Sequence, residues 1–77
     1  MARLTGFVLC VDNQGYQASL IVGKVYPRLS DPEAEKRGLV RVLDEDAQDE
    51  EGYLYPQHLF WPVELPEDVQ RAILAAQ

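Results

Sequence analysis

The sequence contains one cysteine and one histidine among its 77 residues. The lone cysteine, Cys10, excludes an internal disulfide and fits a reducing compartment, so we expect a cytoplasmic protein. Together with the one histidine, His58, it cannot supply the four ligands of a zinc site. The candidate nucleophiles Ser19, Ser30 and Cys10 lie in no nucleophile-elbow or cysteine-protease motif. The sequence therefore predicts no metal, no cofactor and no enzymatic activity.

Long hydrophobic runs and basic clusters are also missing. The apolar run near the N-terminus is interrupted at Asp12 and Asn13, too soon for a signal peptide or a membrane-spanning helix. The seven Lys and Arg residues are scattered, with one adjacent pair at Lys36 and Arg37, whereas nucleic-acid binding needs a basic patch. We therefore predict no membrane contact. Nucleic-acid binding remains a minor alternative, by analogy with other small barrels.

Acidic residues are the main excess, and they are concentrated in one segment. The net charge is -6, and residues 44–51 alone hold six acids. These acids are Asp44, Glu45, Asp46, Asp49, Glu50 and Glu51. The rest of the chain carries seven acids and seven bases and is neutral by formal count. The acidity is therefore a local feature.

The acidic segment has three possible interpretations. A calcium loop of the EF-hand type needs Gly at position six and Glu at position twelve, where this chain has Asp49 and Tyr55. We interpret residues 44–51 as a solvated hairpin tip, whose like charges discourage edge-to-edge aggregation. A docking surface for a basic partner is the leading functional alternative. A loose divalent-ion loop comes third.

Strand patterns cover most of the chain. Five runs are rich in β-branched and aromatic residues: residues 6–11, 18–26, 39–43, 52–56 and 59–63. Gly23 suggests a bulge or bend inside the second run, and Pro27 is expected to stop regular pairing there. Pro56 and Pro62 are expected at strand ends, edges or kinks.

Two helices are predicted. Asp31, Pro32 and the closing Gly38 favour a one-turn helix near residues 32–37. A C-terminal helix is predicted near residues 66–76. Its apolar positions, spaced i, i+3, i+4 and i+7, are Val69, Ala72, Ile73 and Ala76. We expect this apolar face to cover an open end of the sheet.

The order SLIVGKVYPRLSD, GLVRVLDED and EGYLYPQHLFWPVELP resembles small SH3-like barrels of uncharacterised bacterial proteins. The resemblance covers about residues 7–66. It implies a mainly β fold, with a small antiparallel barrel of about five strands in a single domain spanning residues 1–77, and it carries no assigned activity. The ALYDY-like segment of eukaryotic peptide-binding SH3 domains is missing, which disfavours recognition of proline-rich peptides.

The aromatic residues offer a candidate contact surface. Tyr53 and Tyr55 lie two apart, so on a strand they share one face. Tyrosine and tryptophan suit interfaces because one end of the side chain prefers apolar contact and the other prefers water. The candidate patch consists of Tyr16, Tyr26, Tyr53, Tyr55 and Trp61. Core positions are favoured instead for Tyr26, Phe60 and Trp61, and both alternatives stay open for Tyr53 and Tyr55.

The leading hypothesis is a non-enzymatic protein-interaction module whose partner is another protein with a basic surface. Its candidate binding residues are Tyr53, Tyr55, Tyr16, Asp49, Glu50 and Glu51. The tyrosines would supply contact rings, and the acids would steer the basic partner. An accessory or regulatory subunit of an enzyme complex is the first alternative, and a nucleic-acid-binding small barrel is the second.

Overall fold

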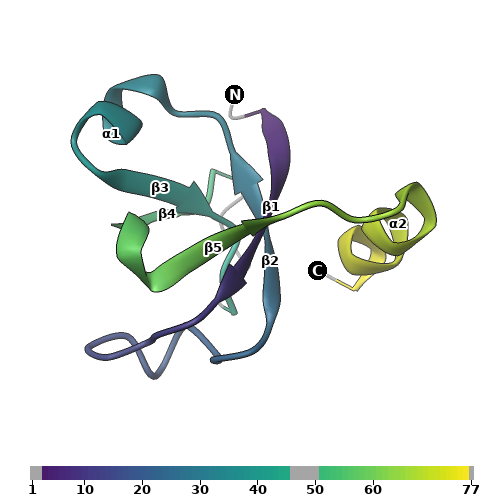
Figure 1. The fold of residues 1–77 in the computed structure, drawn as a ribbon, viewed down its shortest axis with the longest axis horizontal. Helices are drawn as coiled ribbons and strands as arrows, with labels where there is room; N and C mark the ends of the chain where they lie inside the picture. Colours follow the sequence, from purple (N-terminus) through teal and green to yellow (C-terminus); the bar gives the residue numbers. More distant parts are fainter. Residues whose placement is uncertain (1–2, 46–50, 77) are drawn as a thin grey trace.

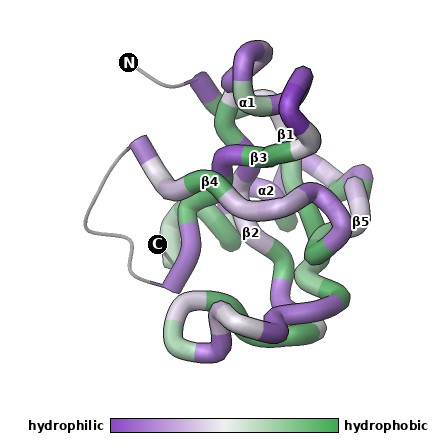
Figure 2. The backbone as a smooth tube through the Cα atoms, turned by 90° about the vertical axis from the view of Figure 1, so that its left-hand side faces the viewer, coloured by the Kyte–Doolittle hydropathy of each residue, from purple (hydrophilic) through white to green (hydrophobic). Residues whose placement is uncertain are grey.

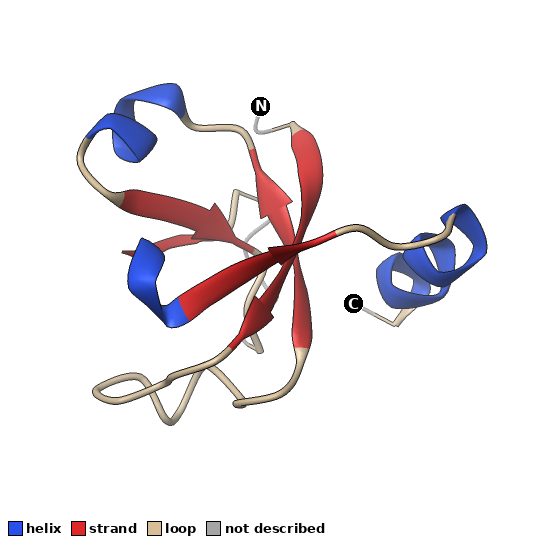
Figure 3. Ribbon diagram, in the orientation of Figure 1, coloured by secondary structure: helices blue, strands red, loops and turns tan. Residues whose placement is uncertain are grey.

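The structure, a computed structural model, describes residues 3–45 and 51–76, and it is mainly β (Figure 1). Five antiparallel strands form one sheet in the order β4-β3-β2-β1-β5. The strands are β1 (Leu4–Cys10), β2 (Val25–Leu29), β3 (Leu39–Val42), β4 (Tyr53–Pro56) and β5 (Phe60–Val63). The helices, blue in Figure 3, are α1 (Pro32–Lys36), the 3-10 turn η1 (Gln57–Leu59) and α2 (Glu67–Ala75). Mainly β architecture, five strands and both α-helices are thus confirmed.

The sheet is strongly curved but has two edges, β4 and β5. Within the part of the chain that the structure describes, no strand pairing joins these two edges. Hydrogen bonds therefore do not close the sheet into a barrel. The same described part contains no helix with the length and hydropathy needed to cross a membrane.

The second strand begins later than the sequence pattern predicts. Residues 18–23 lie in turns and loop rather than in a strand, and β2 starts at Val25. Gly23 has a φ of 91°, in the left-handed region that favours glycine, so it turns the chain rather than bulging a strand. The apolar residues that suggested a strand belong to a folded loop, with Leu20 buried and Ile21 exposed.

Pro27 lies inside β2, opposite Phe7 of β1, so the prediction that it stops pairing is wrong. The carbonyl of Pro27 accepts a hydrogen bond of 3.0 Å from the Leu43 amide, just beyond the end of β3. In a strand the N and C=O of one residue point to the same side, so the missing N–H also lies toward the end of β3. The pairing with β1 is therefore undisturbed. Pro56 and Pro62 lie on the edge strands, as predicted.

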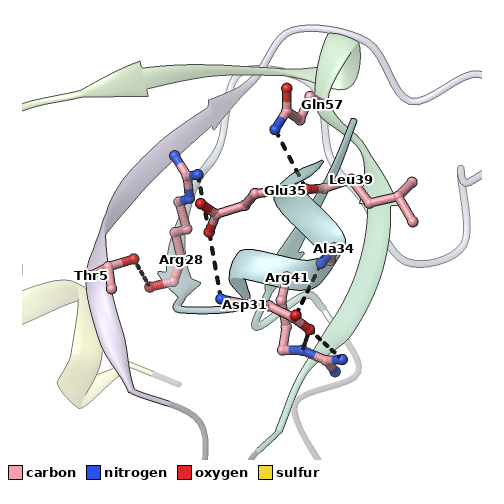
Figure 4. Close-up of polar contacts among 8 residues, drawn as sticks. All are labelled: Thr5, Arg28, Asp31, Ala34, Glu35, Leu39, Arg41 and Gln57. Atoms are coloured by element: carbon pink, nitrogen blue, oxygen red, sulfur yellow. Dashed lines mark hydrogen bonds and ion pairs between the residues drawn. The ribbon is translucent and has the colours of Figure 1, made fainter. Parts of the chain in front are cut away.

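Helix α1 is fixed by its cap and by β3 (Figure 4). The Asp31 carboxylate accepts a 3.1 Å hydrogen bond from the Ala34 amide, as expected of an N-cap residue. Arg41 of β3 approaches the other carboxylate oxygen, with 2.9 Å between Nη2 and Oδ2. The Ala34 amide, followed by Arg41, lowers the pKa of Asp31. Gly38 ends the helix with a φ of 76°, as predicted.

The largest buried cluster lies on one face of the sheet. Val8 lies opposite Tyr26, and Cys10 lies opposite Phe60, so these side chains point to the same face. The buried cluster comprises Val8, Cys10, Leu20, Tyr26, Val40, Val42, Tyr55, Leu59 and Phe60. Figure 2 shows hydrophobic positions on β1, β2 and β3 and hydrophilic ones on α1. Cys10 packs as an apolar residue, as predicted, and burial raises the pKa of its thiol.

Helix α2 does not bury the face that the sequence pattern assigned to the core. None of its residues is buried, and Val69 and Leu74 are each 39% exposed. Figure 1 shows the helix to one side of the sheet, where it contacts β2. Helix α2 follows β5, which is an edge strand. It lies against the outside of the sheet at β2 rather than over the open end. The expectation that α2 covers that end is corrected.

Candidate functional site: a groove lined by tyrosines

Three of the predicted binding residues meet at one hollow of about 390 Å³, which we call the tyrosine groove. Its lining comes from the β1–β2 loop, the segment after β3, and β4. The lining residues are Tyr16, Ser19, Asp44, Tyr53, Leu54 and Tyr55. Tyr16, Tyr53 and Tyr55 are thus brought together from positions up to 39 residues apart in sequence.

Tyr16 is positioned by hydrogen bonds within its loop. The Tyr16 amide donates to the Asn13 carbonyl at 2.8 Å, and the Leu20 amide donates to the Tyr16 carbonyl at 3.0 Å. The Asn13 side chain donates to the Leu20 carbonyl at 2.9 Å. Because Leu20 is buried in the core, these bonds anchor the loop to the rest of the fold. Residues 12–15 form the start of this loop.

Tyr55 forms the floor of the groove rather than an exposed contact ring. Its side chain is 4% exposed and packs edge-on against Tyr16, with ring centroids 5.1 Å apart, and against Phe60 at 6.0 Å. Its hydroxyl donates to the Asp44 carboxylate and lies 2.9 Å from the Ser19 hydroxyl. Burial, followed by the hydrogen bond to Asp44, raises the pKa of Tyr55 to about 12.

Tyr53 differs from Tyr55 because it lies nearer the open end of the strand pair. Tyr53 is opposite Val42, the last residue of β3, whereas Tyr55 is opposite Val40. Strand alternation places both tyrosine side chains on the same face of β4, but the core covers only Tyr55. Tyr53 therefore remains exposed, as do Tyr16 and Leu54, with exposed fractions of 42%, 37% and 40% respectively.

Gly52 allows β4 to start close to β3. Its φ is 67°, and a Cβ atom at this position would clash with the carbonyl oxygen of Val42. Only glycine fits both the backbone conformation and the close approach. The sequence pattern placed Gly52 in the strand and gave no sign of this contact, which depends on the register between β3 and β4.

Asp44, the first residue of the acidic segment, is buried, so its interpretation as part of an exposed tip is corrected. Asp44 is 3% exposed and accepts the hydrogen bond from Tyr55. The Glu45 carboxylate is paired with Lys24 and accepts a 2.6 Å hydrogen bond from the buried Tyr26 hydroxyl. Lys24, then Tyr26, lowers the pKa of Glu45.

Of the other three acids predicted to bind, the structure describes only Glu51, which does not line the groove. Glu51 is exposed, and its carbonyl accepts a 3.2 Å hydrogen bond from Arg41. Asp49 and Glu50 lie outside the residues that the structure describes.

Trp61 is 65% exposed and not in the core, where it was expected. It lies opposite Leu9, on the face away from Val8 and Cys10. Tyr26 and Phe60 are buried, as predicted. The proposed patch of five aromatics therefore does not form one surface, since Tyr26 is internal and Trp61 lies outside the tyrosine groove.

The groove holds no cluster of metal-ligating side chains among the residues described. Within residues 3–45 and 51–76 there is no group of three or more His, Cys, Asp or Glu side chains that could hold a metal ion. His58 is exposed on η1 and is not part of the groove. No protein-family model, curated protein or solved structure matches the chain. Its function must therefore be inferred from the groove itself.

Proposed function

We propose that this protein is a non-enzymatic interaction module that binds a basic segment of another protein at the tyrosine groove. The observation that carries the proposal is the contrast between the floor and the rim of the groove. The exposed Tyr16, Tyr53 and Leu54 surround a floor in which Tyr55 is held by hydrogen bonds. A rigid floor under exposed rings loses little conformational freedom when a partner binds.

The rim has the composition of a protein-binding surface. Tyrosine side chains combine a large contact area with a hydroxyl that tolerates water, and they are enriched among residues that dominate binding energy. Leu54 adds apolar area beside them. We retain the likeness to small SH3-like barrels as part of this proposal, and the five-stranded antiparallel sheet supports it.

The charge of the region favours a basic partner. The net charge of the chain is -6, and the acidic segment lies between Asp44, at the groove, and Tyr53, on its rim. Such charge raises the association rate more than the final affinity, and salt weakens its effect. We therefore expect complex formation to slow as ionic strength rises. A lone thiol agrees with a cytoplasmic setting for such a module.

The test is affinity capture from native lysate with two baits. One is the wild-type chain, and the other carries Tyr16→Ala and Tyr53→Ala. We expect a basic protein to be retained by the wild type and lost by the double variant. Trp61→Ala is the matched control, because it removes an exposed aromatic ring outside the groove. Circular dichroism establishes that all baits fold. Equal capture by the wild type and the double variant would contradict the proposed site.

A second candidate, an accessory or regulatory subunit of an enzyme complex, is favoured by the exposed apolar residues of α2. Val69 and Leu74 have the exposure of surface residues although they are large and apolar. A subunit of this kind should associate or precipitate when purified alone. Light scattering over a concentration series distinguishes the two candidates, because an independent module should remain monomeric.

A further inference from the structure

A second hollow, of about 280 Å³, shares no lining residue with the tyrosine groove. It opens beside the gap between the two edges of the sheet. Its lining residues are Val8, Arg28, Val40, Gln57, Phe60, Trp61 and Pro62. Five of the seven lining residues are apolar, and they share the lining with the guanidinium of Arg28 and the amide of Gln57. A concave apolar site with few polar groups is the usual form of a small-molecule pocket.

Arg28 is incompletely paired. Its Nε atom is buried and has no hydrogen-bond partner among the residues described. Its Nη2 atom lies 3.4 Å from Glu35 Oε2, whereas charge-assisted hydrogen bonds are about 2.7–2.9 Å long. A buried N–H group without an acceptor is unfavourable. Nε itself is covered, so an anion would supply acceptor oxygens to the exposed part of the guanidinium, whose side chain is 29% exposed.

Arg28 is also accessible from two sides. A neighbouring hollow of about 400 Å³ lies between the sheet and the start of α2. It shares Arg28 and Pro62 with the 280 Å³ hollow. Figure 4 shows Arg28 rising from β2 and Gln57 entering from η1, with their polar ends toward the space beside Glu35. The Gln57 amide donates only a long 3.5 Å hydrogen bond to the Leu39 carbonyl, so it is available to a ligand.

We infer that this pocket binds a small carboxylate with an apolar body. The carboxylate contacts the Arg28 guanidinium and the Gln57 amide, and the body packs against Val8, Val40 and Phe60. The planar fork of a guanidinium can form two parallel N–H···O bonds with a carboxylate. The small volume fits one ring or a short chain. This inference is independent of the proposed function at the tyrosine groove.

The charged groups around the pocket set the expected affinity. Glu35 shares the guanidinium with any incoming carboxylate and therefore opposes it. Beside α1, Asp31 and Arg41 form an ion pair of 2.9 Å, and Glu33 and Lys36 form an exposed pair within the helix. Binding should thus be weak in the wild type and stronger when the charge of Glu35 is removed.

The first experiment is a titration of ¹⁵N-labelled protein with phenylacetate, followed by NMR. We expect shifts at the amides of Val8, Val40 and Gln57 and at the Nε–H signal of Arg28. Phenylacetamide, which has the same body without the charge, should leave these signals in place. No shift with phenylacetate, or equal shifts with both compounds, would overturn the inference.

Variants then separate binding from folding. Arg28→Gln should weaken phenylacetate binding by about tenfold or more, as expected for the loss of a charge-assisted pair. Arg37→Gln is the matched control, since it removes an exposed positive charge outside the pocket and should leave affinity unchanged. Glu35→Gln keeps an acceptor for the Asp31 amide and should tighten binding. Tightening identifies competition for Arg28 even if Arg28→Gln does not fold, and unchanged or weaker binding in Glu35→Gln would overturn the inference.

Discussion

Two consecutive acids, Asp44 and Glu45, each accept a hydrogen bond from a buried tyrosine, but in different surroundings. The Tyr26–Glu45 pair lies at the surface end of the core, where Lys24 also binds Glu45 and the carboxylate side chain is 28% exposed. The Tyr55–Asp44 pair lies under the tyrosine groove, where Asp44 is almost fully buried. The Glu45 carboxylate is thus stabilised by Lys24 and by its exposure to solvent. The Asp44 carboxylate is stabilised by groups inside the protein.

The difference explains how one segment serves two purposes. Tyr26 also accepts a 2.9 Å hydrogen bond from the Ile21 amide, so its pair ties the β1–β2 loop to the segment after β3. Tyr55 instead joins the Asp44 carboxylate to the ring of Tyr16 and so shapes the floor of a surface hollow. A solvated pair tolerates change, whereas a buried carboxylate that loses a donor keeps its full desolvation penalty.

The largest expected effect follows from removing each tyrosine hydroxyl in turn. Tyr55→Phe deprives the buried Asp44 of a donor, so it should lower the free energy of unfolding by about 2 kcal/mol, in the range for hydrogen bonds to charged groups. Tyr26→Phe leaves Glu45 with Lys24 and water and removes the acceptor of the Ile21 amide, so it should lower the same quantity by about 1 kcal/mol. Urea denaturation measures both values.

Tyr16→Phe provides the matched control for these variants. Tyr16 is exposed, and its ring rather than its hydroxyl packs against Tyr55, so the change should stay within about 0.5 kcal/mol. A loss in Tyr26→Phe as large as that in Tyr55→Phe would show that burial of the carboxylate does not distinguish the two pairs.

The fold was largely predictable because its signals are local. Asp31, Pro32 and Gly38 specify α1 through capping and backbone preference, and the structure has that helix. Tyr16, Tyr53 and Tyr55, which the sequence offered as contact rings, line one hollow, and their binding role stays a prediction. Local backbone signals could therefore be predicted from the sequence.

The features that the sequence concealed depend on long-range register. In a run of six acids every carboxylate looks solvated, and only the position of Tyr55 opposite β3 shows that Asp44 is internal. The sequence pattern favoured a core position for Trp61 and could not show that the sheet is uncovered at this position, where Trp61 is 65% exposed. The apolar stripe of α2 indicated a helix correctly but not the partner for its apolar face.

The two tyrosines should also limit stability at alkaline pH. Burial and a carboxylate raise the pKa of Tyr55 to about 12, and they raise the pKa of Tyr26 as well. An unfolded tyrosine titrates near pH 10, so this stabilisation is complete below about pH 10 and is lost as pH rises toward 12. Near pH 11 the contribution of Tyr55 should have fallen by about 1 kcal/mol.

Thermal unfolding between pH 9 and pH 12 measures this loss. In Tyr55→Phe the fall of the melting temperature over that range should be shallower than in the wild type, because one ionising phenol has been removed. Tyr16→Phe again serves as the comparison for a phenol that is not buried. An equally steep alkaline fall in Tyr55→Phe would contradict the assignment of this limb to Tyr55.

The smallest effect concerns the cation that separates the two pairs. Lys24 lowers the pKa of Glu45, so the pair stabilises the fold above the unfolded glutamate pKa and loses this contribution as pH falls through the lower folded value. Lys24→Gln should lower the free energy of unfolding at pH 7 by about 0.5 kcal/mol, in the range for a partly exposed ion pair. It should also make the loss of stability at acid pH less steep.

Lys36→Gln is the control, since its ion pair with Glu33 is exposed and 3.9 Å long. Urea midpoints from pH 3 to pH 7 test this, and an unchanged acid limb in Lys24→Gln would mean that Tyr26 alone holds Glu45, making the two pairs alike.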